Sequence, residues 1–227
     1  MVEKEKKINI AFNGFGRIGR NLIRKLINNT KYNIVAINAR TTASVRAHLF
    51  KYDSIHGHFE GTIETELDNL IINDHVIPNF DRSTPKKLPW EELDVDYVID
   101  STGKFCDYYS LHQHIEAGAK NVIVTSPAKD VDATLIYGVN ESDYKLKENN
   151  IISASSCTTT CLTPVLKVLQ KNYGIKHGYI TTVHSFTMGQ TLLDSSHPDL
   201  RRARAATLSM IPTTTGAAKN VGVVLPE

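Results

Sequence analysis

The chain has 227 residues, enough for one large domain or two modest ones, and its hydrophobic (41%) and charged (22%) contents are ordinary for a folded protein. Its formal net charge of +2 is too small to indicate nucleic acid or an anionic membrane surface as a partner. The Lys-rich start lacks the apolar segment of a signal peptide, and no apolar run approaches the roughly 20 residues that cross a bilayer. Three cysteines, an odd number, give no disulfide framework, so we expect a cytoplasmic protein.

The first forty residues predict a βαβ unit. Residues 8–13 form a short apolar run that is typical of a buried strand. Apolar side chains then recur at helical spacing over residues 17–28, and a second apolar strand is predicted over residues 34–37.

The following hundred residues continue the alternation of strands and helices. A helix is predicted over residues 108–117, ending at Gly118, and Asn73 with Asp74 indicates a hairpin turn. Further strands are predicted over residues 70–72, 76–77, 97–100, 122–125 and 135–137. This order favours an α/β fold with a mostly parallel, doubly wound sheet of the Rossmann type.

The pattern changes after residue 153. A helix is predicted over residues 158–171, a strand over 179–183, and a last helix from about Gly216. We therefore place a dinucleotide-binding domain over residues 1–156 and the start of an α+β catalytic domain over residues 157–227. The last apolar residues, 223–225, have nothing after them to cover them, so we interpret the second domain as truncated.

A glycine motif opens the first predicted helix. Gly14, Gly16 and Gly19 form G-x-G-x-x-G between a strand and a helix, which is the context required of a dinucleotide-binding fingerprint. Gly14 allows the tight turn, Gly16 lets the backbone approach the pyrophosphate, and Gly19 permits close helix packing. The alternative interpretation is an ordinary turn between a strand and a helix.

The end of the second strand bears on the choice between NAD and NADP. An acidic residue about 20 positions after the glycines would bind the ribose 2′-hydroxyl, but this chain has Ala39 followed by Arg40. Arginine can pair with a 2′-phosphate through two donors, which favours NADP over NAD. The alternative is that Arg40 is a solvated loop residue.

Cys157 stands immediately before a predicted helix. The N-terminus of a helix stabilises negative charge and raises the thiolate fraction. His184 follows the next predicted strand and is a candidate base, although no spacing rule shows that the two side chains meet. Cys161, one turn further along, is expected to be buried and inert. No spacing typical of a metal site is present, and we predict none.

Several ordered motifs make the chain resemble the glyceraldehyde-3-phosphate dehydrogenase family from about residue 8 to its end. The motifs are NGFGRIGR (13–20), KYDS (51–54), STG (101–103), SCTT (156–159), HSFT (184–187), DLRRARA (199–205) and IPTTTGAAK (211–219).

The resemblance implies an activity and a set of site residues. The activity is oxidation of glyceraldehyde 3-phosphate with inorganic phosphate to 1,3-bisphosphoglycerate, through a thioester on Cys157 with His184 as base. It implies a cofactor site formed by Gly14, Gly16, Arg17, Ile18, Arg82, Ser101, Gly103 and Ser126. To these the glycine fingerprint adds Gly19, and the end of the second strand adds Ala39 and Arg40. The resemblance implies phosphate-binding positions at Ser156, Thr158, Thr187, Arg202, Thr215 and Gly216.

The resemblance also implies a homotetramer when the protein is full length, with residues 185–204 near a neighbouring subunit's cofactor. Two alternatives stay open. One is an erythrose-4-phosphate dehydrogenase, and the other is a non-catalytic fragment that retains only dinucleotide binding.

Overall fold

A computed structural model of the chain describes residues 6–145, 148 and 150–226. The chain divides into two compact units, Met1–Ser156 (the first unit) and Cys157–Glu227 (the second unit). None of the helices among the described residues is long and apolar enough to cross a membrane.

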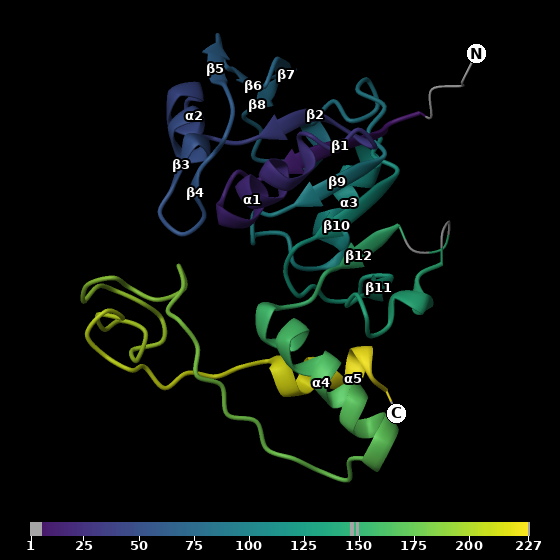
Figure 1. The fold of residues 1–227 in the computed structure, drawn as a ribbon, viewed down its shortest axis with the longest axis vertical. Coiled ribbons are helices and arrows are strands. Elements are labelled where there is room, and N and C mark those ends of the chain that lie inside the picture. Colours follow the sequence, from purple (N-terminus) through teal and green to yellow (C-terminus); the bar gives the residue numbers. More distant parts are fainter. Residues whose placement is uncertain (1–5, 146–147, 149, 227) are drawn as a thin grey trace. The chain divides into compact units, whose positions relative to one another are not determined.

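The first unit is built on a seven-stranded sheet in which the paired strands run parallel. In spatial order the strands are β11 (Ala133–Thr134), β12 (Ile151–Ser153), β10 (Asn121–Val124), β9 (Tyr97–Asp100), β1 (Ile8–Asn13), β2 (Tyr32–Asn38) and β8 (Asn79–Phe80) (Figure 1). From β8 to β12 this is the strand order of a doubly wound dinucleotide-binding sheet.

Helices and two small antiparallel sheets complete the first unit. The helices are α1 (Arg17–Leu26), α2 (Ala43–Lys51), α3 (Tyr108–Glu116) and the short 3₁₀ helices Pro85–Lys87 and Glu141–Asp143. The antiparallel pairs join β3 (Tyr52–Asp53) to β4 (Gly57–His58), and β6 (Asn69–Ile72) to both β5 (Ile63–Glu66) and β7 (His75–Ile77).

The direction of the crossovers places α1 and α3 on opposite faces of the large sheet. The connection from β1 through α1 leads to β2 on one side, whereas the connection from β9 through α3 leads to β10 on the other. Because parallel crossovers are right-handed, reversing the direction reverses the face that the helix covers. The reversal lies between β1 and β9, and ligands bind outside the carboxyl ends of the strands at such a switch point.

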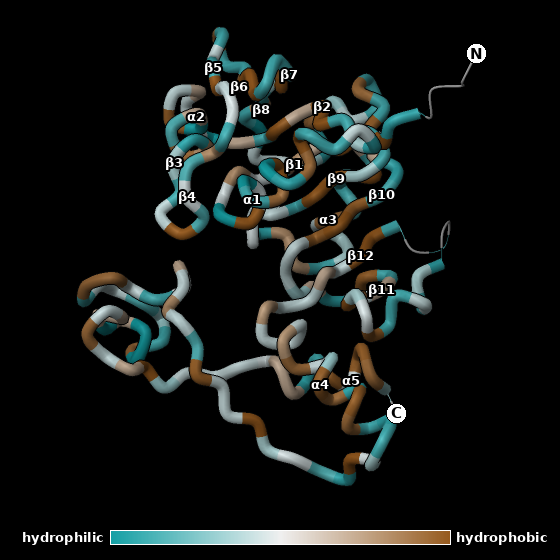
Figure 2. Tube along the Cα trace, in the orientation of Figure 1, coloured by the Kyte–Doolittle hydropathy of each residue, from teal (hydrophilic) through white to brown (hydrophobic). Residues whose placement is uncertain are grey.

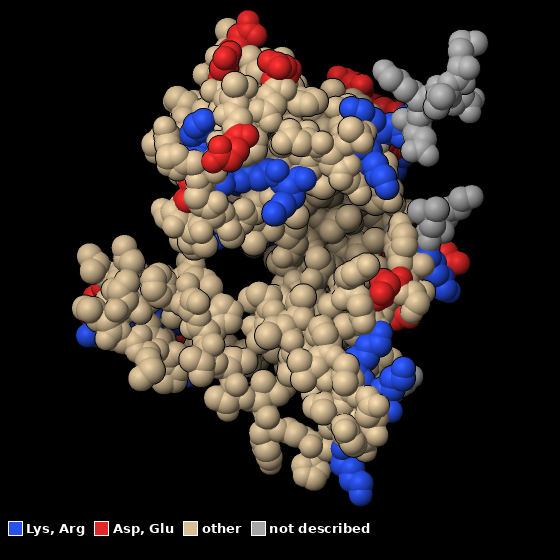
Figure 3. Space-filling model, in the orientation of Figure 1, with Lys and Arg blue, Asp and Glu red and all other residues tan. Residues whose placement is uncertain are grey.

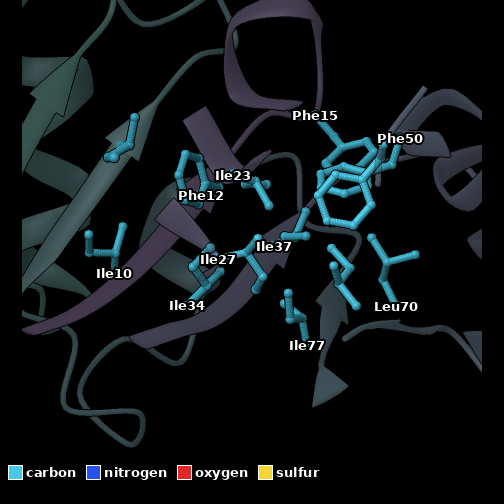
Figure 4. Close-up of a cluster of buried hydrophobic side chains, with 13 residues drawn as sticks. Ile10, Phe12, Phe15, Ile23, Ile27, Ile34, Ile37, Phe50, Leu70 and Ile77 are labelled. Atoms are coloured by element: carbon cyan, nitrogen blue, oxygen red, sulfur yellow. The ribbon is translucent and has the colours of Figure 1, made fainter. Parts of the chain in front are cut away.

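Strand β1 is buried on both faces, as expected of a central parallel strand. Ile10 and Phe12 point into a hydrophobic cluster on one face, shown in Figure 4, whereas Ala11 belongs to a cluster on the other. Figure 2 shows that the neighbouring strands β2, β9 and β10 are also mainly hydrophobic. Full burial of a side chain such as Phe12 stabilises the fold by about 2–3 kcal/mol.

The described part of the second unit contains two helices, α4 (Cys157–Tyr173) and α5 (Ala217–Val224), which contact each other. Ala217 and Val224 are buried, but most large apolar side chains of the intervening segment are exposed. The described residues of this unit form no β-strand that could pack against α4 or α5. This unit therefore depends on local contacts and on one pair of helices.

The predicted βαβ opening, the helix ending near Gly118 and the hairpin turn are confirmed. Asn73 and Asp74 both have positive φ (48° and 68°), which suits the tight turn between β6 and β7. The helices predicted from residues 158 and 216 are confirmed within one residue of their starts.

Two strand predictions are wrong. Residues 135–137 follow β11 as a turn, because Asn140 accepts from the Ile136 N–H and donates to the Thr134 carbonyl (both 2.9 Å). Residues 179–183 form no strand, and the side chains of Tyr179 and Val183 are fully exposed because the described segments offer them no strand to pair with.

Helix α2 was missed because a charged side chain takes a core position. Arg46 is fully buried and interrupts the apolar periodicity, and its guanidinium donates to the Thr41 carbonyl and to Asp68.

Candidate active site

A pocket of about 340 Å³ opens at the switch point of the first unit. It lies at the carboxyl ends of β1, β2 and β9, where the chain leaves the sheet. Its lining residues are Asn13, Gly14, Phe15, Gly16, Asn38, Ala39, Arg40, Thr41, Arg82, Ser83, Ser101, Thr102, Lys104 and Phe105. The location and size suit a nucleotide-containing ligand.

The glycines of the fingerprint give this pocket its shape. Gly14 has φ +104°, and a Cβ there would lie 2.9 Å from the backbone of Ser101 and Thr102. A Cβ on Gly19 would lie 2.5 Å from the Gly14 carbonyl oxygen. At Gly16 a Cβ would meet no atom within 4 Å, so this position leaves open space against the backbone. The three positions fit a dinucleotide, with room for a pyrophosphate beside Gly16.

The start of α1 provides donors for an anion. The helix begins at Arg17, and its N-cap residue Gly16 makes no side-chain cap hydrogen bond. The first N–H groups of a helix have no partner within it, and the helix dipole favours negative charge there. Basic side chains also gather over α1, as Figure 3 shows.

The side chain of Asp53 holds part of this basic surface. Arg17 and Arg20 pair with it at 3.3 and 3.9 Å. Hydrogen bonds from the backbone N–H groups of His56 and Ile55 hold the pKa of Asp53 well below its usual range, and Arg17 adds to this effect. Asp53 therefore stays ionised and fixes Arg17 at the first position of α1.

The pocket lining also contains the residues that bear on the 2′ position of the ribose. Ala39 and Arg40 follow β2, and Arg40 is exposed and has no ion-pair partner among the described residues. The backbone of Arg82 is held by Asn38, whose amide oxygen accepts from the Arg82 N–H at 2.9 Å and whose amide nitrogen donates to the Arg82 carbonyl at 2.9 Å. Arg40 is thus available to an anionic group of a ligand.

The structure gathers part of the predicted cofactor set. The pocket lining includes Gly14, Gly16, Ala39, Arg40, Arg82 and Ser101. Of the described residues, Arg17, Ile18, Gly19, Gly103 and Ser126 were predicted for this site and are not in the lining. Gly19 lies beneath it against Gly14, and Ser126 accepts from the Ser153 hydroxyl through its carbonyl at 2.8 Å.

The second unit brings Cys157 and His184 together. The Cys157 Sγ lies 3.4 Å from His184 Nε2 and 3.8 Å from the Thr158 hydroxyl. His184 Nδ1 lies 2.7 Å from the Ser185 carbonyl oxygen, which can only accept, so Nδ1 carries a proton. In the neutral ring Nε2 is then the acceptor that faces the thiol, as a general base requires.

The charges of this pair favour the thiolate. The hydrogen bond with His184 lowers the pKa of the Cys157 thiol, and the Thr158 hydroxyl adds to the effect. The Ser185 carbonyl raises the pKa of His184, and so does the contact with Cys157. Cys157 is also the first residue of α4, where the helix dipole acts in the same direction. The pair can therefore supply a nucleophilic sulfur and a proton acceptor in contact.

The prediction for Cys161 is wrong. Its side chain was expected to be buried one turn after Cys157, but it is exposed, because the described segments place no apolar layer over this face of α4. Both thiols are free, and only Cys157 has a histidine within hydrogen-bonding distance among the described residues.

A second polar group in this unit contains two of the predicted phosphate-binding residues. Arg202 donates from Nε to the Thr213 hydroxyl at 2.7 Å. A Cβ on Gly189 would lie 3.7 Å from the Thr187 hydroxyl and 4.0 Å from an Arg202 nitrogen, so Thr187 and Arg202 face the same small space. Arg202 Nε lies 3.8 Å from Asp199, and Arg202 Nη2 also donates to the Thr213 hydroxyl, so among the described residues Nη1 is the nitrogen that an anion could bind.

The remaining predicted phosphate-binding residues lie at the starts of α4 and α5. Ser156 and Thr158 flank Cys157 in the chain, and both are partly exposed. Gly216 is the N-cap residue of α5, and the Thr215 hydroxyl accepts from the Ala217 N–H at 3.2 Å. Among the described residues, Arg202 and the Cys157–His184 pair have different hydrogen-bond partners, so no hydrogen bond links the predicted phosphate site at Arg202 to the reactive pair.

Some pocket residues were not predicted, namely Asn13, Phe15, Asn38, Thr41, Ser83, Thr102, Lys104 and Phe105. A signal was present in the sequence, because Asn13 ends one predicted strand and Asn38 directly follows the next, and polar residues at the carboxyl ends of parallel strands meet at one edge. The described residues contain no group of three or more His, Cys, Asp or Glu side chains that could hold a metal ion.

Sequence models of two protein domains match the chain. Residues 8–108 match the model described as glyceraldehyde 3-phosphate dehydrogenase, NAD binding domain. Residues 156–227 match the model described as glyceraldehyde 3-phosphate dehydrogenase, C-terminal domain.

Individual relatives give the same result. The chain is 48% identical to glyceraldehyde-3-phosphate dehydrogenase of Geobacillus stearothermophilus, over 97% of the chain and 66% of the relative. It is 49% identical to glyceraldehyde-3-phosphate dehydrogenase 2 of Bacillus subtilis, over 97% and 65%. It is 50% identical to the chloroplastic glyceraldehyde-3-phosphate dehydrogenase A of Chlamydomonas reinhardtii, over 100% and 61%. The chain thus spans slightly less than two thirds of the length of these curated relatives.

Proposed function

Because this chain belongs to the glyceraldehyde-3-phosphate dehydrogenase family, we propose that it carries the dinucleotide site and the reactive thiol of a phosphorylating aldehyde dehydrogenase. The substrate is glyceraldehyde 3-phosphate, the second substrate is inorganic phosphate, and the product is 1,3-bisphosphoglycerate. The observation that supports the proposal most strongly is the 3.4 Å contact between Cys157 Sγ and His184 Nε2, with the thiol pKa lowered by that contact.

The reaction begins at Cys157. His184 Nε2 takes the thiol proton, and the thiolate attacks the aldehyde carbon, forming a C–S bond while the carbonyl π electrons move to oxygen. The protonated His184 then donates to that oxygen and stabilises its charge. The result is a thiohemiacetal on Cys157.

Oxidation converts the thiohemiacetal into a thioester. A bound nicotinamide dinucleotide would supply the oxidant, taking a hydride from the former aldehyde carbon. His184 accepts the proton of the hemiacetal hydroxyl, so the acyl group remains on Cys157 as a thioester. Phosphate then attacks the acyl carbon, the C–S bond breaks, and the Cys157 thiolate leaves with the acyl phosphate released.

The phosphate groups would be held by neutral donors and one arginine. We assign Ser156, Thr158, Thr215 and Gly216 to the attacking phosphate, and Thr187 and Arg202 to the neighbouring phosphate position. The common space that faces Thr187 and Arg202 supports the second assignment, because a cation beside a hydroxyl donor binds a phosphate oxygen well.

The dinucleotide is proposed to be NADP in preference to NAD. Arg40 lines the pocket, is exposed and has no ion-pair partner among the described residues, and Ala39 offers no carboxylate to a ribose 2′-hydroxyl. A 2′-phosphate would pair with the guanidinium of Arg40, whereas a 2′-hydroxyl would gain little from it.

We also propose that the whole protein assembles as a homotetramer in the cytoplasm. Exposed apolar side chains of the second unit, including Phe186, Met188 and Leu200, support a partner subunit over residues 185–204.

The direct test measures reduction of NAD and of NADP, separately, with glyceraldehyde 3-phosphate and phosphate. Turnover that requires phosphate, with NADP the faster cofactor, is the expected result. Faster turnover of erythrose 4-phosphate would assign the other aldehyde. Dinucleotide binding without turnover of either aldehyde would reduce the function of this chain to cofactor binding.

A further inference from the structure

A buried chain of hydrogen bonds lies beneath the pocket of the first unit. It joins Trp90, His114, Asp100, Asn13 and Asn38, all of them buried, and none has a role in the proposed reaction. Asn13 and Asn38 line the pocket directly, so this series of hydrogen bonds connects the interior of the unit to the pocket wall.

The carboxylate of Asp100 is the common acceptor in this series of hydrogen bonds. Its Oδ2 accepts from Asn13 Nδ2 at 2.6 Å and lies 3.3 Å from His114 Nε2. Its Oδ1 accepts from the N–H and the hydroxyl of Thr102, at 3.0 and 2.8 Å. Thr102 also lines the pocket, so Asp100 holds one lining residue at the end of β1 and another just after β9.

The orientation of the His114 ring follows from its other partner. Trp90 Nε1 can only donate, and it does so to His114 Nδ1 at 2.9 Å. The ring proton therefore lies on Nε2, which donates to Asp100 rather than to the Asn13 amide nitrogen 3.3 Å away.

The acceptor character of Asp100 sets the direction of the two amides that follow. Because Asn13 turns its NH₂ group towards Asp100, its oxygen faces outward and accepts from Asn38 Nδ2 at 2.7 Å. With that orientation, Asn38 presents its own oxygen to the Arg82 N–H and its nitrogen to the Arg82 carbonyl. Reversing the first amide would reverse the second and break both contacts with the Arg82 backbone.

We propose that Asp100 is a positioning residue of the dinucleotide pocket, which acts through Asn13 and Asn38 to hold the wall at Arg82 and through Thr102 to hold the wall at β9. This inference rests on the proposed function, because it takes the pocket to be the dinucleotide site. Asp100 itself does not line the pocket. Its effect is to keep the pocket in its binding shape before the ligand arrives.

The test uses Asp100→Asn, which keeps the shape of the side chain and replaces one acceptor by a donor. The new NH₂ group cannot accept a hydrogen bond. In one orientation of the amide it would face the donors of Asn13 and His114, and in the other it would face those of Thr102. We expect the dissociation constant for NADPH, measured by fluorescence on the folded full chain, to rise roughly tenfold or more. Amide exchange at Arg82, measured without ligand, should become faster because its acceptor on Asn38 is displaced.

A double variant separates positioning from general loss of stability. In Asn13→Asp combined with Asp100→Asn, the carboxylate moves to position 13, where it can accept from the new amide at position 100, from His114 and from Asn38. Asn38 then keeps its orientation towards Arg82. We expect the double variant to restore slow amide exchange at Arg82 and to bind NADPH more tightly than Asp100→Asn alone, although it retains the substitution that weakened binding.

Asn140→Asp is the matched control. Asn140 is another buried amide of the first unit, it donates to the Thr134 carbonyl, and it lies outside the pocket lining. Its replacement should lower the melting temperature and leave the NADPH dissociation constant unchanged.

The outcomes distinguish the two proposals. If the unmodified chain binds neither NADPH nor NADH, the proposed function fails and the positioning role fails with it. If the unmodified chain binds and Asp100→Asn binds equally well, with unchanged Arg82 exchange, only the positioning role is overturned. If Asp100→Asn does not fold, fast amide exchange at Arg82 in the folded double variant overturns it.

Discussion

In the first unit the groups around the pocket rest on buried hydrogen bonds, whereas in the second unit Cys157 and His184 meet at an exposed surface. Asn13, Asp100 and His114 are at most 2% exposed, and three hydrophobic clusters surround the sheet that carries the first two of them. In the second unit, side chains such as Tyr179 and Val183 remain fully exposed to water. The pocket is therefore stabilised by the core of its own unit, whereas the reactive pair is held by contacts close to it.

The largest expected effect comes from removing the thiol. We expect Cys157→Ser to lower the rate of acyl transfer by at least about 10³-fold, because a serine hydroxyl in this position lacks the acidity of the thiol. Binding of NADPH should stay within about twofold, since the pocket belongs to the first unit. Rapid single-turnover kinetics and a fluorescence titration measure the two quantities. Retained dehydrogenase turnover would disprove the role of Cys157.

A core substitution should show the same contrast in stability. Phe12→Ala removes a fully buried ring from the first unit and should lower the free energy of unfolding by about 3–5 kcal/mol. Val183→Ala, on a fully exposed side chain of the second unit, should change it by at most about 0.5 kcal/mol. Urea denaturation followed by circular dichroism measures both, and equal effects would contradict the proposed difference between the units.

The reactivity of Cys157 should depend on pH through its partner. Because the Cys157 pKa is lowered, its thiolate is present above that pKa and is lost as the pH falls through it. Because the His184 pKa is raised, the imidazolium that stabilises the thiolate is lost as the pH rises through it. We expect His184→Ala to move the profile of alkylation by iodoacetamide to higher pH and to slow it roughly tenfold near pH 7.

Cys161→Ser is the control for this profile. Cys161 is an exposed thiol on the same helix, and its removal should leave the fast alkylation and its pH dependence in place. If the fast reaction is lost in this variant, the reactive thiol is Cys161 and not Cys157.

The smallest expected effect concerns the choice between the two cofactors. Ala39→Asp would place a carboxylate where a 2′-phosphate is proposed to bind, so the ratio of NADP to NAD affinity should fall roughly tenfold. Ala39→Asn supplies nearly the same volume without the charge and should change the ratio much less. An unchanged ratio in Ala39→Asp would refute the proposed role of Arg40.

Much of the first unit could be predicted from the sequence because its signals are local. The apolar run of β1, the periodic helix α1 and the glycines between them lie within twenty residues, and the structure confirms these elements. The strand predicted over residues 179–183 failed because a strand needs a partner, and local pattern contains no information about the partner. Helix α2 was hidden by its buried Arg46.

The local sequence pattern predicted less of the candidate site. The glycine fingerprint predicted the pocket, but the hydrogen bond from Asn13 to Asp100 beneath it joins residues 87 positions apart. Such contacts depend on the strand order of the sheet, which periodicity does not give. The contact of Cys157 with His184 spans 27 positions and was expected only from the resemblance to a family.

The most direct test of the central claim is to look for the acyl group on Cys157. The unmodified chain would be mixed with glyceraldehyde 3-phosphate and NADP in the absence of phosphate, quenched in acid, digested and analysed by mass spectrometry. We predict an acyl adduct on Cys157 that disappears when phosphate is added before quenching. Reduction of NADP with no adduct on Cys157, or with the adduct on Cys161, would contradict the account.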